Sequence, residues 1–216
     1  MTEPLRIAKA AEDLVLLPGL ANRHGLVAGA TGTGKTVTLQ RLAESFSRLG
    51  VPVFMADVKG DLTGITQAGS VSAKLAAVLK ERGIAPSPSV ACPATLWDVY
   101  GKSGHPVRAT VSEIGPSLLA RMLELNDVQA GVLDVAFKLA DEQGLLLLDL
   151  DDLRSLLNLV SDKHAEVSQR YGLVSPQSVA AIQRALLRLE GEGGKQFFGE
   201  PALELADLMR TDLTGR

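Results

Sequence analysis

The 216-residue sequence has few of the residues that build disulfides and metal sites. It contains one cysteine, Cys92, and three histidines, His24, His105 and His164, which lie far apart. A single cysteine excludes an intrachain disulfide, and the scattered histidines lack the ligand spacing of structural zinc. The composition is compatible with a reducing compartment and gives no indication of a zinc protein.

Long apolar runs and a strong charge of one sign are also missing. The apolar run at 145–148 is far shorter than the roughly 20 residues that cross a bilayer, and residues 1–4 do not begin a signal peptide. The 22 Lys and Arg residues nearly balance the 25 Asp and Glu residues, so the net charge of −3 gives no electrostatic sign of nucleic-acid binding. We expect a cytoplasmic protein without a membrane segment.

A complete phosphate-loop motif, G-x-x-x-x-G-K-[ST], is present at 29–36. Its residues are Gly29, Ala30, Thr31, Gly32, Thr33, Gly34, Lys35 and Thr36. An apolar run at 26–28 and a helical pattern at 37–49 predict the strand, loop and helix that this motif requires. The glycines let backbone N–H groups surround phosphates, Lys35 is expected to bridge the β- and γ-phosphates, and the Thr36 hydroxyl is expected to ligate Mg²⁺. The sequence therefore predicts a site for ATP and Mg²⁺.

The apolar run at 51–56 predicts a buried strand that ends at Asp57. Because open α/β folds bind ligands at the carboxyl ends of their strands, Asp57 is a candidate to support the Mg²⁺ shell or to position water. A solvated loop in which Asp61 caps the following element is the alternative. The guanine-reading motif Asn-Lys-x-Asp does not occur, which favours ATP over GTP.

The remaining patterns predict short strands and many helices. Residues 5–7 and 14–17 favour two strands, and residues 95–100 and 106–111 alternate as in a hairpin. Helical patterns or caps occur at 72–81, 116–125, 127–142, 151–160, 161–171, 176–190 and 202–209.

A phosphate-loop ATPase also needs a carboxylate on a neighbouring strand to hold Mg²⁺, and Asp149 is the candidate that the sequence offers. The residues after Asp149 continue at helical spacing, which favours the alternative that Asp149 is a helix N-cap. We therefore expect the nucleotide-binding core to be incomplete at the C-terminus of this chain.

Residues 21–36 and 53–62 together resemble the HerA-like bacterial ATPases, in particular the YjgR-type branch, which was long catalogued as a domain of unknown function. Residues 179–184 and 197–203 resemble the same branch. The resemblance implies a RecA-like core of the HerA and FtsK superfamily, whose members form hexameric rings and move DNA. It implies phosphate-loop roles for Gly29, Gly32, Gly34, Lys35 and Thr36, and an acidic strand-end role for Asp57. The family's Mg²⁺ strand, catalytic glutamate and trans-acting arginine are expected beyond Arg216.

We predict an α/β fold: a RecA-like P-loop NTPase core with a helical insertion. Residues 1–70 would hold the N-terminal strands and the P-loop β-α-β unit, 71–114 a helix and a β-hairpin, and 115–216 a mainly helical insertion. The predicted function is the ATP-binding portion of a ring-forming motor that acts on double-stranded DNA, with Lys35 and Asp57 as catalytic residues. A regulatory nucleotide-binding switch is the alternative. A small-molecule kinase is disfavoured, because such kinases need a lid of arginines over the phosphates and the late helices show only Arg184 and Arg188 on spaced positions.

Overall fold

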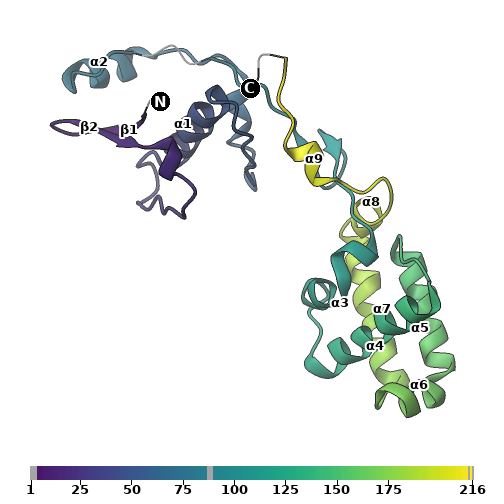
Figure 1. Cartoon of the computed structure of the whole chain (residues 1–216). Coiled ribbons are helices and arrows are strands. Elements are labelled where there is room, and N and C mark those ends of the chain that lie inside the picture. Colours follow the sequence, from purple (N-terminus) through teal and green to yellow (C-terminus); the bar gives the residue numbers. More distant parts are fainter. Residues whose placement is uncertain (1–3, 87–89, 214, 216) are drawn as a thin grey trace. The chain divides into compact units, whose positions relative to one another are not determined.

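A computed structural model describes residues 4–86, 90–213 and 215 of the chain. It is a mixed α/β structure with many helices and small two-stranded sheets (Figure 1). The chain divides into two compact units, one formed by Met1–Ala94 with Leu205–Arg216 and the other by Thr95–Glu204. Within the described ranges no helix combines the length and the apolar character that crossing a bilayer would demand. The predicted division at 1–70, 71–114 and 115–216 stays a prediction.

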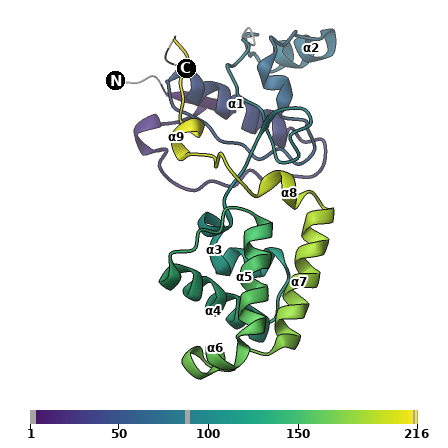
Figure 2. The ribbon, with the colours of Figure 1, turned by 90° about the vertical axis from the view of Figure 1, so that its right-hand side faces the viewer.

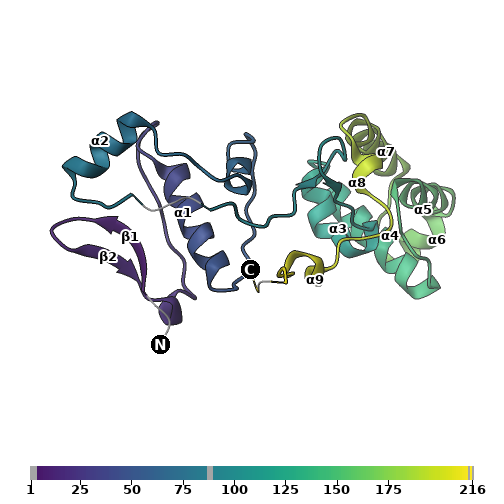
Figure 3. The ribbon, with the colours of Figure 1, turned by 90° about the horizontal axis from the view of Figure 1, so that it is seen from above.

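The first unit begins with an antiparallel hairpin of β1 (Leu5–Lys9) and β2 (Asp13–Leu16), which confirms the two strands predicted there. Leu5 lies opposite Leu16, and the register shifts between Arg6 and Ala8. A 3-10 helix at Pro18–Leu20 follows the hairpin. The hairpin lies beside α1 (Lys35–Arg48), and their contact buries Leu5 (Figure 3).

After α1, the first unit contains a 3-10 helix at Thr63–Thr66, α2 (Ala73–Glu81) and the short α9 (Leu205–Leu208). The predicted helix at 72–81 is confirmed. Ser72 is its N-cap, and its hydroxyl accepts a hydrogen bond from the amide of Leu75 at 3.2 Å. The predicted helix at 202–209 is reduced to the four residues of α9.

The strands predicted at 26–28 and 51–56 are wrong, because neither segment pairs as a strand in the structure. Their apolar side chains are solvent-exposed: Leu26 is 90% exposed and Phe54 is 71% exposed. A buried parallel strand depends on hydrogen-bonded neighbours at its edges and on helices that cover its faces. Among the described residues these two segments lack such strand neighbours, so their apolar character alone does not make them strands.

The second unit is a bundle of helices around one hydrophobic core. Its helices are α3 (Val111–Met122), α4 (Asp127–Gln143), α5 (Leu150–Asp162), α6 (His164–Tyr171), α7 (Pro176–Gly191) and the short α8 (Gly194–Phe197). Helix α7 lies beside both α4 and α5 (Figure 2). The largest fully buried side chains of the core are Leu119, Leu123, Leu133, Leu153, Leu157, Ile182 and Leu186. The apolar stripes seen in the sequence are therefore core positions.

Local caps explain where these helices begin. Capping boxes join Thr110 with Glu113 at the start of α3 and Asn126 with Gln129 at the start of α4, and each satisfies free N–H groups in the first turn. Helix α3 begins five residues before the predicted start at 116 because of its capping box, and Gly115, with a φ of 70°, kinks it. The helices predicted at 127–142, 151–160 and 176–190 are confirmed, and that predicted at 161–171 begins at His164.

The predicted hairpin of 95–100 and 106–111 is wrong. Two-residue strands β3 (Trp97–Asp98) and β4 (His105–Pro106) pair in parallel instead. The carboxylate of Asp98 accepts hydrogen bonds from the amides of Tyr100, Lys102 and Ser103 at 2.7–2.9 Å, which rolls the connecting residues into a compact loop. These local hydrogen bonds from one side chain to the backbone compete with a regular hairpin.

Candidate nucleotide-binding site

The phosphate-loop motif forms a tight turn that leads directly into α1. The amide and the hydroxyl of Thr33 both donate to the carbonyl oxygen of Ala30, at 3.4 and 2.8 Å. Gly32 and Gly34 have positive φ angles of 81° and 92°, which residues with a side chain rarely adopt. The two glycines therefore permit the turn that delivers the chain to the first residue of α1.

The N-terminus of α1 is open. Gly34 is its N-cap, and within the described chain no side chain caps it. The amide of Thr38 donates to the carbonyl of Gly34 at 2.9 Å, so the amides of Lys35, Thr36 and Val37 precede the helical hydrogen-bond ladder. Such unpaired amides, together with the positive end of the helix dipole, attract phosphate.

Lys35 lies over the same loop. Its ammonium group donates to the carbonyl oxygen of Ala30 at 2.7 Å and remains accessible to solvent. The positive charge is therefore held next to the open helix terminus. An anion bound by the first amides of α1 would therefore have the Lys35 ammonium group nearby.

Gly29 packs closely against the side chain of Thr33 within the loop. A Cβ atom at this position would lie 2.5 Å from the Thr33 hydroxyl oxygen, closer than real Cβ contacts come. A side chain at position 29 would therefore displace the Thr33 hydroxyl from its hydrogen bond to Ala30. The residues present fit the close backbone approach that a nucleotide triphosphate needs. Bound Mg²⁺–ATP would be held by the loop amides, Lys35 and Thr36.

Asp57 stabilises its own turn. Its carboxylate accepts hydrogen bonds from the amides of Gly60 at 2.8 Å and Leu62 at 2.9 Å. Desolvation by itself would raise the pKa of Asp57, but the backbone amides of Leu62, Gly60, Lys59 and Asp61 together outweigh it and lower the pKa below the ordinary value of 3.8. Asp57 is therefore a charged carboxylate at neutral pH. The alternative role for Asp61 is wrong, because Leu62 is the N-cap of the 3-10 helix at Thr63–Thr66.

A hydrogen bond joins this turn to α1. The side-chain amide of Gln40 donates to the carbonyl oxygen of Asp61 at 3.1 Å. Gln40 follows Thr36 by four residues, and residues four apart share one face of a helix. The turn that Asp57 organises therefore lies against the face of α1 that carries Thr36. Sequence reasoning missed Gln40, although its spacing from Thr36 was a usable signal.

Asp149 lies in the second unit and has the role of a helix cap. Its carboxylate accepts hydrogen bonds from the amides of Asp151 and Asp152, both at 2.9 Å, at the start of α5. The N-cap alternative is therefore confirmed. The described residues contain no group of three or more His, Cys, Asp or Glu side chains that could hold a metal ion.

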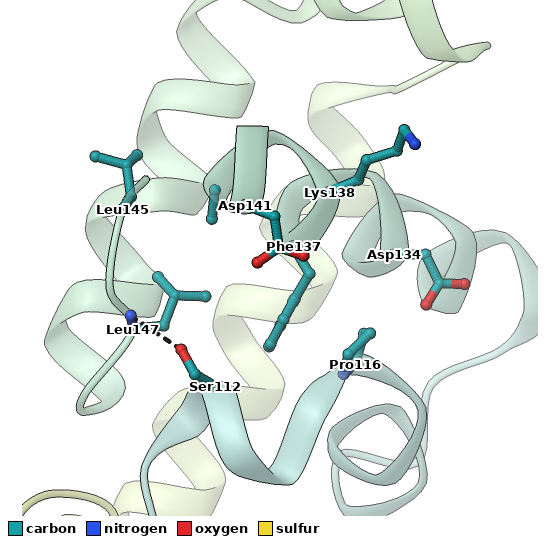
Figure 4. Close-up of a pocket in the computed structure, with 9 residues that line it drawn as sticks. Ser112, Pro116, Asp134, Phe137, Lys138, Asp141, Leu145 and Leu147 are labelled. Atoms are coloured by element: carbon teal, nitrogen blue, oxygen red, sulfur yellow. Dashed lines mark hydrogen bonds between the residues drawn. The ribbon is translucent and has the colours of Figure 1, made fainter. Parts of the chain in front are cut away.

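The second unit contains a hollow of about 280 Å³ between α3, α4 and 145–147. Figure 4 shows the ring of Phe137 extending between Ser112 and Pro116, with Asp141 nearby. The Ser112 hydroxyl accepts a hydrogen bond from the amide of Leu147 at 3.2 Å. Two carboxylates, Asp134 and Asp141, and one cation, Lys138, line the hollow, so its charge disfavours phosphate. The phosphate-loop turn remains the candidate nucleotide site.

The structure places the glycine-lined turn, the open N-terminus of α1 and Lys35 together, whereas residues 26–28, expected as the strand before the turn, do not pair as a strand. The sequence matches the protein-family model described as Helicase HerA-like C-terminal over residues 4–216. The chain belongs to this family, as its sequence motifs predict, and the family provides the context of HerA-like ATPase motors. No curated protein and no solved structure gives a significant match to the chain.

Proposed function

We propose that this chain binds ATP with Mg²⁺ at its phosphate loop and serves as the nucleotide-binding portion of a HerA-like motor ATPase with a RecA-like core. The observation that carries the proposal is the open N-terminus of α1, with Lys35 held 2.7 Å from the Ala30 carbonyl beside it. Lys35 would move from Ala30 onto the β- and γ-phosphates, and the Thr36 hydroxyl would ligate Mg²⁺. Bound Mg²⁺ would neutralise charge on the phosphates.

In this proposal Asp57 acts next to the Mg²⁺ shell. The hydrogen bond from Gln40 to Asp61 holds the turn of Asp57 against the face of α1 that carries Thr36. The lowered pKa of Asp57 keeps its carboxylate ionised. An ionised carboxylate in this turn suits water molecules around Mg²⁺. The assembly would be cytoplasmic, a hexameric ring as in HerA-like ATPases, with double-stranded DNA as the partner on which it works.

The proposal is tested by measuring ATP binding and steady-state hydrolysis by residues 1–216 over a range of protein concentrations, with and without double-stranded DNA. The Lys35→Ala variant provides the blank. Mg²⁺-dependent ATP binding, with turnover that rises with DNA and with self-association, supports a motor. Absence of Mg²⁺-dependent ATP binding by the wild-type chain would contradict the proposal.

A regulatory nucleotide-binding switch is the second candidate function. The link between Gln40 and Asp61 favours it, because a change at Thr36 on nucleotide binding could pass along α1 to the turn of Asp57. A switch predicts tight nucleotide binding, a conformational change and turnover that DNA does not alter. The DNA dependence of turnover therefore separates the two functions.

A further inference from the structure

A second cavity of the helical unit has the opposite charge character from the one in Figure 4. It also measures about 280 Å³ and lies between the turn that joins α3 to α4 and the side of α7. Arg184 and Arg188 line it from α7, and Gln129 lines it from the first turn of α4. Leu125 and Ala181 supply apolar surface. The whole cavity lies within the unit Thr95–Glu204.

The two arginines differ in their partners. Arg188 donates from Nη2 to the carbonyl oxygen of Leu123 at 3.3 Å and to the carboxylate of Glu124 at 3.4 Å. Arg184 forms no hydrogen bond or ion pair within the described part of the chain. Because the two residues are four apart on α7, their side chains share one face of the helix. The cavity therefore presents one free guanidinium group and one held by a weak, exposed pair.

Glu124 has an unusual backbone conformation. Its φ of 55° is the one positive value among the described residues other than glycine. The C-terminal end of α3 is closed by two hydrogen bonds: the Glu124 amide donates to the carbonyl oxygen of Arg121, and the Leu125 amide donates to that of Ala120. A residue with positive φ at such a helix end is normally glycine. An exposed ion pair contributes little to stability and does not offset this strain. The Glu124 carboxylate lies 3.4 Å from Arg188 and is 77% exposed, so an oxyanion already lies beside this guanidinium group in a position that solvent reaches.

We propose that this cavity binds a phosphoryl oxyanion through Arg184 and Arg188, and that the anion displaces the carboxylate of Glu124. The planar guanidinium group matches the oxygen geometry of phosphate, and two such groups outnumber the single carboxylate that lines the cavity. The source that we assign is the DNA backbone, whose sugar carbons suit the apolar surface of Leu125 and Ala181. This assignment of the source rests on the proposed motor function, whereas the oxyanion site itself does not.

The test compares four variants of residues 1–216: Arg184→Gln, Glu124→Gln, Glu124→Gly and the control Lys163→Gln. Lys163 is exposed in the same helical unit, has no ion pair there, and its change removes the same charge as Arg184→Gln. Binding of fluorescent double-stranded DNA is measured by anisotropy at several salt concentrations, and binding of inorganic phosphate is measured by phosphorus NMR.

We expect Arg184→Gln to weaken DNA binding about tenfold and to reduce the salt slope of log K by about one, as loss of one phosphate contact does. Both Glu124 variants should tighten binding, and Glu124→Gly should also raise Tm because it relieves the positive φ. The control should match the wild type. Unchanged DNA and phosphate binding in Arg184→Gln would overturn the proposal.

The two probes distinguish the sources of the phosphate. Loss of phosphate binding in Arg184→Gln, with no DNA binding by the wild-type chain, would support the oxyanion site and overturn DNA as its source. Loss of DNA binding in Arg184→Gln, with ATP binding also lost in Lys35→Ala, would support this site and the nucleotide site independently. DNA binding that depends on Arg184 in a chain that binds no ATP would support this site while contradicting the proposed ATPase.

Discussion

The ammonium group of Lys35 lies 2.7 Å from the carbonyl oxygen of Ala30, five residues earlier in the same loop. This hydrogen bond holds the lysine charge beside the first amides of α1, which no side chain of the described residues caps. The nucleotide site is therefore arranged by local chain geometry. A bound phosphate would replace the carbonyl oxygen as the partner of Lys35.

Replacing Lys35 tests the nucleotide site directly. We expect Lys35→Ala to weaken Mg²⁺–ATP binding and lower any turnover by roughly 100-fold or more, because a cation at the phosphates is lost. Titration calorimetry with ATP measures the binding. The matched control is Lys74→Ala, since Lys74 is an exposed lysine of the first unit on α2, outside the loop and the turn of Asp57. Wild-type affinity in Lys35→Ala would refute the proposed role of the phosphate loop.

Thr36 should matter through its hydroxyl group. Thr36→Val keeps the size of the side chain but removes the Mg²⁺ ligand, so we expect it to lose the part of ATP affinity that depends on Mg²⁺. Thr36→Ser keeps the hydroxyl and should behave as the wild type. ATP binding measured with Mg²⁺ and with EDTA separates the two contributions. Equal Mg²⁺ dependence in the Val and Ser variants would rule out Thr36 as a ligand.

Gly29 should be intolerant of a side chain. Gly29→Ala places a Cβ atom 2.5 Å from the Thr33 hydroxyl oxygen, so this hydroxyl must leave its hydrogen bond to Ala30 and ATP affinity should fall by about tenfold. Gly25→Ala is the control, because a Cβ atom there meets nothing within 4 Å. Nucleotide affinity of both variants is measured by fluorescence titration. Similar effects of the two changes would show that the loop does not need the close approach at Gly29.

Asp57 should respond to acid. Its folded pKa lies below the ordinary value of 3.8, so its charged form stabilises the turn above pH 3.8, and this contribution disappears as the pH falls through the lower folded pKa. NMR titration of the Asp57 carboxyl carbon measures the midpoint. In the wild type the amide chemical shifts of Gly60 and Leu62 should follow the same titration, because both amides donate to the Asp57 carboxylate. In Asp57→Asn these shifts should no longer change at low pH. A midpoint at or above 3.8 in the wild type would contradict the amide contacts.

Asp149 should affect stability and leave nucleotide binding unchanged. Asp149→Ala removes the cap of α5 and should lower the free energy of unfolding by about 1 kcal/mol. Thermal unfolding measures the loss, and Asp149→Asn, which can still accept the capping bonds, should retain most of the stability. A specific loss of Mg²⁺–ATP binding in Asp149→Ala, with unchanged Tm, would restore the metal-ligand interpretation.

The helices could be predicted because their signals are local. Ser72, Asp149 and Ser175 each lie immediately before a helix in the sequence, and each caps it in the structure. Such caps act over three residues and need no partner from elsewhere in the chain. The same holds for the phosphate loop, since Gly29, Gly34 and Lys35 interact with close sequence neighbours.

The strands and the links between segments could not be predicted in this way. A strand is stable only beside a hydrogen-bonded neighbour, and apolar runs such as 51–56 do not specify one. The sequence by itself determined the family, the phosphate-loop motif and most helix starts, because these depend on adjacent residues. The tertiary structure decided the parallel pairing of β3 with β4, the contact of Gln40 with Asp61 and the cavity at Arg184, because each joins residues that only folding brings together.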